Sequence, residues 1–124
     1  FGRWSRVAAA RANLRGGPTT ASPVRRVLPQ HTALRLAGSS GGWHRVHLPD
    51  GTDGFIAASL LRSADTALRT ASFARATIRH RPEVTAAVTD SLNGEAVGVH
   101  GRFEEFVLIE RPGRTKGWVQ DRRG

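Results

Sequence analysis

Short stretches of alternating apolar and polar residues, separated by turn-forming residues, run along the whole chain. In its first half the pattern predicts strands ending at Leu14 and at 24–28, 33–37, 43–48 and 54–57, with a helical turn at 58–61. In its second half it predicts strands at 74–79, 86–92, 95–99, 103–109 and 116–120. Gly, Pro, Ser and Asp mark the turns between them, the longest being the loop 38–42. Short strands with a turn about every eight to twelve residues predict an all-β fold of small barrels.

The apolar pattern occurs twice. Residues 10–15 (ARANLR) return as 74–79 (ARATIR), a spacing of 64 that shortens to 63 between Leu28 and Leu34. The matched positions are apolar residues or turn formers; they include Pro18 and Pro82, Leu34 and Val97, Leu36 and Val99, Gly38 and Gly101, Trp43 and Phe106, and 54–56 and 117–119. Because such residues define strand faces and turns, the repetition predicts two copies of one β-rich unit.

The repeat also predicts the domain boundaries. We expect an N-terminal arm at 1–9, a first domain at 10–62, a linker at 63–72 with Leu68 as an apolar anchor, and a divergent second domain at 73–124. Units of about 55 residues bury only a modest fraction of their surface and are marginally stable alone. The two copies are therefore expected to pack on each other or on a partner.

The chain is strongly basic, and the charge is unevenly distributed. The net charge is +9, carried by 18 Arg and Lys116. Residues 1–62 hold nine Arg against two acids, a net +7, whereas residues 63–124 hold ten basic residues against eight acids, a net +2. A basic surface favours acidic partners such as anionic lipid head groups, teichoic or nucleic acid polymers, or an acidic protein face.

The composition also excludes several classes of chemistry and structure. The chain has no Cys, which excludes disulfides, thiolate metal ligands and Cys nucleophiles. No apolar run approaches the roughly 20 residues of a membrane-spanning helix, so no transmembrane segment is expected. There is no Met, even at position 1. A cleaved signal peptide, a lost lipid-anchored leader or simple trimming would each explain that start.

No catalytic motif, cofactor motif or metal-ligand spacing is present. His44 and His47 are three residues apart on a predicted strand and therefore point to opposite faces. Glu104 and Glu105 are adjacent on a predicted strand and diverge for the same reason, so we expect them at a solvated or partner-facing edge. We predict no enzymatic activity, no cofactor and no bound metal.

The aromatic residues are expected to belong mainly to the core. Trp43, Phe55, Phe106 and Trp118 occupy positions that both copies keep apolar. Few aromatics then remain for a ligand groove, which favours a broad protein–protein contact made by Arg side chains and strand edges. Only Trp4 and His44 interleave with Arg, and single-stranded nucleic acid binding needs more stacking side chains than that. Nucleic acid is therefore disfavoured as a partner.

Three motifs in order carry a family resemblance. They are 12–18 (ANLRGGP), 41–46 (GGWHRV) and 50–56 (DGTDGFI), the last followed by Ser59-Leu60. On these residues the first copy resembles the bacterial SH3-like domain family. The second copy departs from the pattern, with Thr77 in place of Asn13, His80-Arg81 in place of Gly16-Gly17, and Phe106 in place of Trp43. The resemblance implies a compact barrel of five to seven strands, usually outside the cytoplasm, with an accessory, non-catalytic role.

Together these observations predict two tandem SH3-like β-barrels in a non-catalytic, extracytoplasmic interaction protein. Our hypothesis is a scaffold or accessory subunit docked on a larger envelope or membrane-protein assembly. It would be located in the periplasm or cell envelope and associate with a membrane through its partner or a preceding segment. The alternative is a module that targets a hydrolase to peptidoglycan. The candidate partner-binding residues are Phe1, Arg3, Trp4 and Arg6 in the arm, and Arg25, Arg26 and Arg45 in the first copy. Residues 1–9 could instead be a terminus without a role.

Overall fold

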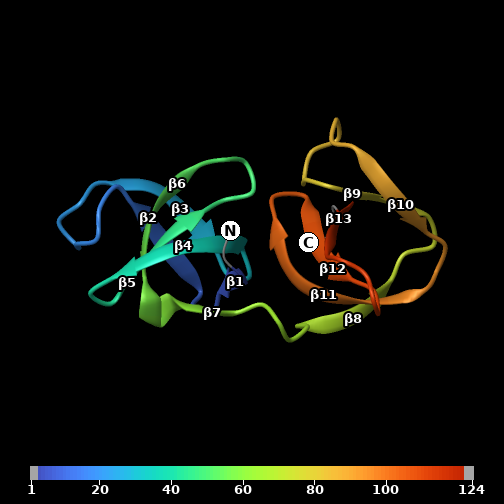
Figure 1. Ribbon diagram of the computed structural model, residues 1–124, viewed down its shortest axis with the longest axis horizontal. Helices are drawn as coiled ribbons and strands as arrows, with labels where there is room; N and C mark the ends of the chain where they lie inside the picture. The colour runs from blue at the N-terminus through green and yellow to red at the C-terminus, as the bar shows by residue number, and fades with distance from the viewer. Residues whose placement is uncertain (1–2, 122–124) are drawn as a thin grey trace. The chain divides into compact units, whose positions relative to one another are not determined.

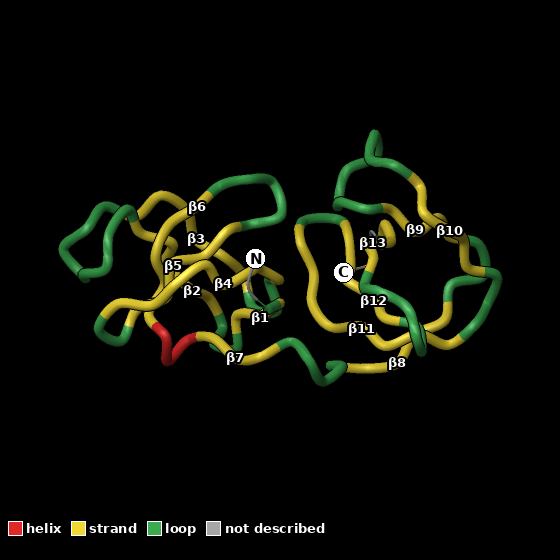
Figure 2. Tube along the Cα trace, viewed as in Figure 1, coloured by secondary structure: helices red, strands yellow, loops and turns green. Residues whose placement is uncertain are grey.

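The computed structural model, which describes residues 3–121, is built almost entirely of antiparallel strands (Figures 1 and 2). The chain divides into two compact units, domain 1 up to Asp65 and domain 2 from Thr66. Each unit has its own sheet, with seven strands in domain 1 and six in domain 2. The predicted all-β fold with two SH3-like domains is confirmed.

Domain 1 is one antiparallel sheet with the strand order β3-β2-β6-β5-β4-β1-β7. Its elements are β1 (Trp4–Val7), β2 (Arg11–Arg15), β3 (Val24–Pro29), β4 (Ala33–Ser40), β5 (Trp43–His47), β6 (Asp53–Ala57), the 3-10 turn η1 (Ala58–Leu60) and β7 (Leu61–Ser63). Alternate residues of the strands face a hydrophobic core, as period-2 patterning requires. Leu14, Leu28, Leu34, Val46 and Ile56 form much of it, each at most 2% exposed.

Domain 2 repeats the arrangement with the strand order β10-β9-β13-β12-β11-β8. Its strands are β8 (Arg69–Ser72), β9 (Ala76–Arg79), β10 (Val88–Leu92), β11 (Ala96–Phe103), β12 (Phe106–Glu110) and β13 (Gly117–Gln120). The core contains Phe73, Ile78, Leu92, Val97, Val99, Val107, Ile109 and Val119. Each strand occupies the place of its sequence counterpart in domain 1, and even the β-bulge recurs, at Leu36/Gly38 and Val99/Gly101.

The segment predicted as an N-terminal arm contributes a strand to domain 1. β1 pairs with β4 through Ser5 and Leu34, and with β7 through Ser5 and Ser63. Val7 is completely buried. The prediction that residues 1–9 lie outside the first domain is therefore wrong for the described part. Sequence patterning missed this strand because four residues are too few to show a clear period.

The segment predicted as a linker is also largely structured. β7 completes the sheet of domain 1, while β8 pairs with β11 in domain 2. Only the few residues between these strands connect the domains. Leu68, predicted as an apolar anchor, is 38% exposed, whereas Ala64 is buried completely. Since β8 takes the place in domain 2 that β1 takes in domain 1, the repeat extends beyond the part recognised in the sequence.

Two hairpin turns differ from the sequence prediction. The loop expected at 38–42 shrinks to Gly41-Gly42, because β4 continues to Ser40. Both glycines have positive φ, 52° and 85°, which a residue without a side chain adopts without strain. In domain 2 the corresponding turn is Glu104-Glu105, with φ 53° at Glu104. The predicted strand 103–109 is therefore the end of β11, a turn and β12, and the two glutamates are exposed at the turn.

Candidate functional site

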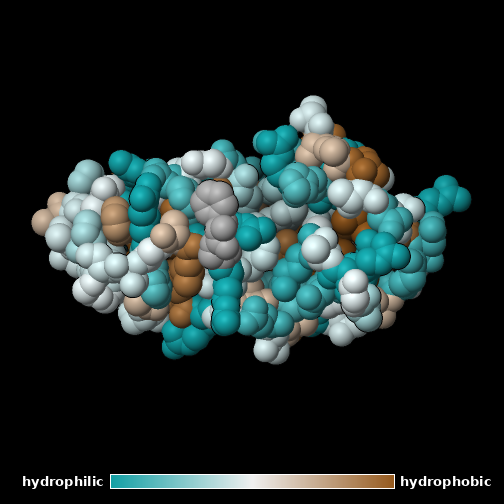
Figure 3. Space-filling view, viewed as in Figure 1, coloured by the Kyte–Doolittle hydropathy of each residue, from teal (hydrophilic) through white to brown (hydrophobic). Residues whose placement is uncertain are grey.

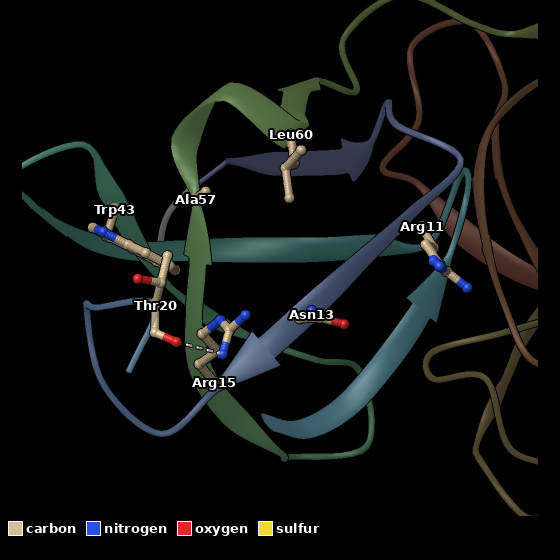
Figure 4. Close-up of a pocket in the computed structure, with 7 residues that line it drawn as sticks. All are labelled: Arg11, Asn13, Arg15, Thr20, Trp43, Ala57 and Leu60. Atoms are coloured by element: carbon tan, nitrogen blue, oxygen red, sulfur yellow. Dashed lines mark hydrogen bonds between the residues drawn. The ribbon is translucent and has the colours of Figure 1, made fainter. Parts of the chain in front are cut away.

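The candidate site is a groove in domain 1 where two neighbouring strands separate. β2 and β6 pair at a single position, where Arg15 lies opposite Phe55. Beyond that pair the strands diverge, so Asn13 and Arg11 move away from Ala57 and from η1 (Figure 4). The gap forms an open hollow of about 280 Å³. It is lined by Arg11, Asn13, Arg15, Thr20, Trp43, Ala57 and Leu60.

Strand alternation decides which side chains of β2 reach this groove. Ala12 and Leu14 are buried in the core, at 2% and 0% exposure. Arg11, Asn13 and Arg15 therefore project from the opposite face, toward the groove. These three residues were not among the predicted binding residues. The alternation inside 10–15 was the signal that could have identified them, since the motif ANLR places its apolar residues on one face.

Trp43 is a groove residue and not a core residue. It pairs with Ala57 across β5 and β6, while the next pair, His44 and Ile56, faces the other side of the sheet. Trp43 is half-buried, as is Phe55 on the same outer face. The sequence prediction of core positions is thus wrong for both residues. It is confirmed for their counterparts Phe106 and Trp118, which are 5% and 2% exposed.

Arg15 has a structural role at the end of the groove. Its Nη1 donates hydrogen bonds to the backbone oxygens of Thr20 and Ser22, both at 3.0 Å. The backbone N–H of Gly16 donates to the oxygen of Pro23 at 2.9 Å. The loop between β2 and β3 is consequently held against the strand, and Thr20 forms part of the groove wall. A guanidinium used in this way fixes the shape of the groove more than it offers charge to a ligand.

Three other groove side chains have polar groups available for a ligand. Within residues 3–121, no hydrogen bond or ion pair involves the side chains of Arg11, Asn13 or Trp43. Their guanidinium, carboxamide and indole N–H groups supply donors, and the Asn13 oxygen supplies one acceptor. The indole ring adds a flat apolar surface at the opposite end of the groove from Arg11 (Figure 4). The groove therefore offers positive charge, directional hydrogen bonds and one aromatic contact.

The predicted arm residues lie elsewhere in domain 1. Phe1 lies outside the described residues. Arg3 is highly exposed and faces Asp65 at 3.8 Å. The Trp4 ring lies beneath the guanidinium of Arg35, 4.3 Å from its carbon atom, a cation–π contact. Arg6 projects from β1, and burial lowers the pKa of its guanidinium from the usual value without removing its charge at neutral pH.

The predicted binding residues of the first copy are engaged within domain 1. Arg25 and Arg45 contact the two carboxylate oxygens of Asp53 at 3.4 and 3.3 Å. Arg26 contacts Asp50 at 2.7 Å. The two acids of residues 1–62 thus offset two of the three positive charges of Arg25, Arg26 and Arg45. None of the six predicted residues that the structure describes lines the groove.

The ion pair between Arg26 and Asp50 has a counterpart of opposite polarity in domain 2. Arg26 lies on β3 and Asp50 in the turn before β6. At the equivalent positions Asp90 lies on β10 and accepts hydrogen bonds from Arg111 and Arg114, at 2.9 and 3.5 Å, near the turn before β13. Both domains therefore hold the edge strand to the same turn by charge, with the signs exchanged.

Other surface features are modest. The face in Figure 3 is mainly hydrophilic, with small separate apolar patches. The edge strands expose a few valines: Val24 and Val27 on β3, and Val88 on β10. In the described part of the chain, no three residues of the types that bind metals lie together. Nor does any helix there have the length and hydropathy to cross a membrane.

The comparison with known proteins bears on domain 1. Residues 10–62 match the family model described as the bacterial SH3 domain. The match contains β2 to β6 and η1, and hence all seven residues that line the groove. Among curated proteins, no match is found.

Proposed function

Because residues 10–62 belong to the bacterial SH3 domain family, we propose that the protein is a non-catalytic binding protein of the cell envelope. Its groove between β2 and β6 holds an extended acidic segment of a partner protein. In this role the protein is an accessory subunit or scaffold of a larger envelope assembly. The observation that carries the proposal is the groove itself, with Arg11, Asn13 and Trp43 unengaged by other described residues.

The chemistry of the groove matches an acidic peptide. A guanidinium binds a carboxylate through two parallel hydrogen bonds, a geometry that adds specificity as well as energy. The Asn13 carboxamide can donate to and accept from a peptide backbone. The Trp43 ring offers a rigid contact for an apolar side chain. Arg25, Arg26 and Arg45 already contact Asp50 or Asp53. Of the two arginines that line the groove, Arg15 is engaged with the backbone oxygens of Thr20 and Ser22, so Arg11 is the groove cation best placed to meet a carboxylate.

A second candidate ligand is the stem peptide of peptidoglycan. The main sequence argument against a cell-wall ligand was the shortage of exposed aromatic residues. Trp43 weakens that argument, because it lies in the groove and not in the core. A stem peptide is also short, extended and acidic, and a hollow of about 280 Å³ accommodates only a few residues of any ligand. Both candidates use the same groove and differ in the molecule that carries the peptide.

The test compares two baits and three proteins. The full chain is incubated with gently solubilised membranes and, in parallel, with purified cell wall. The wild type is compared with the double variant Arg11→Ala/Trp43→Ala and with Arg25→Ala, a control that removes the same charge outside the groove. Recovery of a stable set of membrane proteins that is lost in the double variant and kept in Arg25→Ala supports the partner-protein proposal.

The alternative outcomes are equally informative. Retention on cell wall alone, with the same dependence on Arg11 and Trp43, selects the stem peptide. If the double variant stays folded by circular dichroism and binds both baits as the wild type does, the groove is not the binding site and the proposal fails. Equal loss in Arg25→Ala and in the double variant would indicate attraction by net charge and would also contradict a groove.

A further inference from the structure

Domain 2 contains a hollow at the position equivalent to the groove of domain 1. It measures about 190 Å³ and is lined by Phe73, Arg75, Ala76, Thr77, Arg79, Val119 and Gln120. Four of these are the repeat counterparts of groove residues: Arg75 of Arg11, Thr77 of Asn13, Arg79 of Arg15 and Gln120 of Ala57. The hollow forms for the same reason as in domain 1: β9 and β13 pair at a single position, where Arg79 lies opposite Trp118.

The construction of the wall is repeated as well. Arg79 Nη1 donates to the backbone oxygen of Ala86 at 2.9 Å, as Arg15 does to Ser22. The N–H of His80 donates to the oxygen of Ala87 at 2.9 Å, as Gly16 does to Pro23. The loop therefore follows the same course although its Gly-Gly motif is absent. In both domains an arginine of the strand makes the same hydrogen bond to the backbone of the loop. The shape of the groove is therefore kept in domain 2, although the Gly-Gly motif of domain 1 is not.

The polar groups of this second groove include one unengaged cation. Arg75 is exposed, and within the described residues its side chain makes no hydrogen bond or ion pair. The hydroxyl of Thr77 lies two residues along the same strand face. Gln120 Nε2 donates to Glu105 at 3.3 Å, which leaves its oxygen as an acceptor. An exposed aromatic ring like that of Trp43 is missing, because Phe106 is buried and does not line the hollow, and Phe73, which does line it, is itself buried at 8% exposure.

We propose that this groove of domain 2 is a second binding site, for the carboxylate groups of the same class of acidic peptide, with Arg75 and Thr77 as its recognition residues. The inference rests on the function proposed for domain 1. Since the groove is smaller and its one aromatic residue, Phe73, is buried, it selects carboxylates without regard to neighbouring apolar side chains, and it binds more weakly than the groove of domain 1. The full chain therefore takes up two acidic segments, one in each domain.

The probe is acetylated, amidated tetraglutamate, with tetraglutamine as the uncharged comparison, titrated into the ¹⁵N-labelled full chain. Chemical-shift changes are expected at 11–15 and 57–60 in domain 1, and separately at 75–79 and 119–120 in domain 2. Arg75→Ala weakens binding in domain 2 about tenfold or more and leaves domain 1 unchanged, because it removes a charge-assisted contact. Arg11→Ala has the reciprocal effect. Arg81→Ala is the control, since this exposed arginine of domain 2 pairs with Glu83 outside the groove.

The outcomes separate the two proposals. Shifts in domain 1 alone overturn the second site and leave the function of domain 1 standing. Shifts in neither domain overturn both. Shifts in domain 2 that survive Arg75→Ala, or that fall equally in Arg81→Ala, show attraction to net charge and overturn the second site. Circular dichroism of each variant confirms that loss of binding is not loss of folding.

Discussion

Gly54 lies beside the one pair that joins β2 to β6, and replacing it with alanine tests how the groove is formed. A Cβ at this position would be 2.7 Å from the backbone oxygen of Arg15 and 2.8 and 2.9 Å from Cγ and Cδ1 of Leu14. Real Cβ atoms do not approach other atoms so closely. The side chain of Leu14 is completely buried and cannot move aside. The Arg15 oxygen is part of the backbone of β2, so it can move only if the strand moves. The variant Gly54→Ala must therefore push β2 away from β6.

The magnitude follows from two opposing effects. Overpacking of this kind costs about 1–3 kcal/mol, and a clash with backbone belongs at the upper end of that range. The alanine reduces the entropy of the unfolded chain, which offsets about 0.4–1 kcal/mol. We expect a net loss of about 2 kcal/mol in the free energy of unfolding. For a domain of this size that lowers Tm by roughly 8–16 °C.

The assay is urea and thermal unfolding, followed by circular dichroism and by the fluorescence of Trp4 and Trp43. Gly38→Ala is the matched control, because Gly38 lies in the same sheet without a positive φ, and an added methyl group there would have nothing within 4 Å. We expect its free energy of unfolding to rise by about 0.4–1 kcal/mol, because only the effect on the unfolded chain remains. Equal Tm values for Gly54→Ala and Gly38→Ala would refute the close approach of β2 and β6 at Arg15 and Phe55, and with it the account of the groove.

Three further predictions concern the edges of the sheet and its charges. Removing residues 1–7 is expected to unfold domain 1, since it deletes β1 with its buried Val7; a heteronuclear NMR spectrum that keeps the dispersed signals of 11–57 would contradict this. Reversing one charge, Asp50→Arg or Arg26→Asp, should cost about 0.5–1 kcal/mol, and combining the two should restore most of the loss, as measured by a double-mutant cycle in urea; additive losses would exclude the ion pair. Burial raises the pKa of Asp50, but the hydrogen bonds from Arg26 and Thr52 and the charge of Arg26 outweigh this effect, so the net pKa is lowered. The ionised Asp50 therefore stabilises the folded state at neutral pH, and this contribution is lost as the pH falls below about 4. Asp50→Asn should consequently lose less Tm than the wild type between pH 6 and pH 2.5, and an identical loss would contradict the assignment.

Much of the fold could be predicted from the sequence because the signals are local. The alternation of apolar residues located β2 to β6 and β9 to β13 to within a few residues, and Gly41-Gly42 marked the hairpin that joins β4 and β5. The strands β1 and β8 escaped prediction because each has only four residues and owes its place to pairing with distant strands. Their sequences carry little periodicity of their own, and a short strand is recognised by what it pairs with.

The candidate site was harder to predict than the fold. The prediction concentrated on Arg and Trp residues near the N-terminus and on Arg25, Arg26 and Arg45, because those residue types dominate binding interfaces. In the structure the latter three contact Asp50 or Asp53, acids 8 to 28 residues away in sequence. Whether an arginine is available to a ligand depends on such distant partners. Composition shows how many charges there are, but not which of them are neutralised within the domain.

The sequence by itself determined that the chain forms two copies of one all-β unit, where most strands and turns lie, and that 10–62 carry the motifs of the bacterial SH3 domain family. These properties follow from side-chain periodicity and turn chemistry, which act over a few residues. Only the tertiary structure decided that Trp43 faces a groove, that Arg15 holds the groove wall, and that β2 and β6 separate after one pair. Those features depend on the register and divergence of strands about 40 residues apart, where close contact at Gly54 and the twist of neighbouring strands leave a gap.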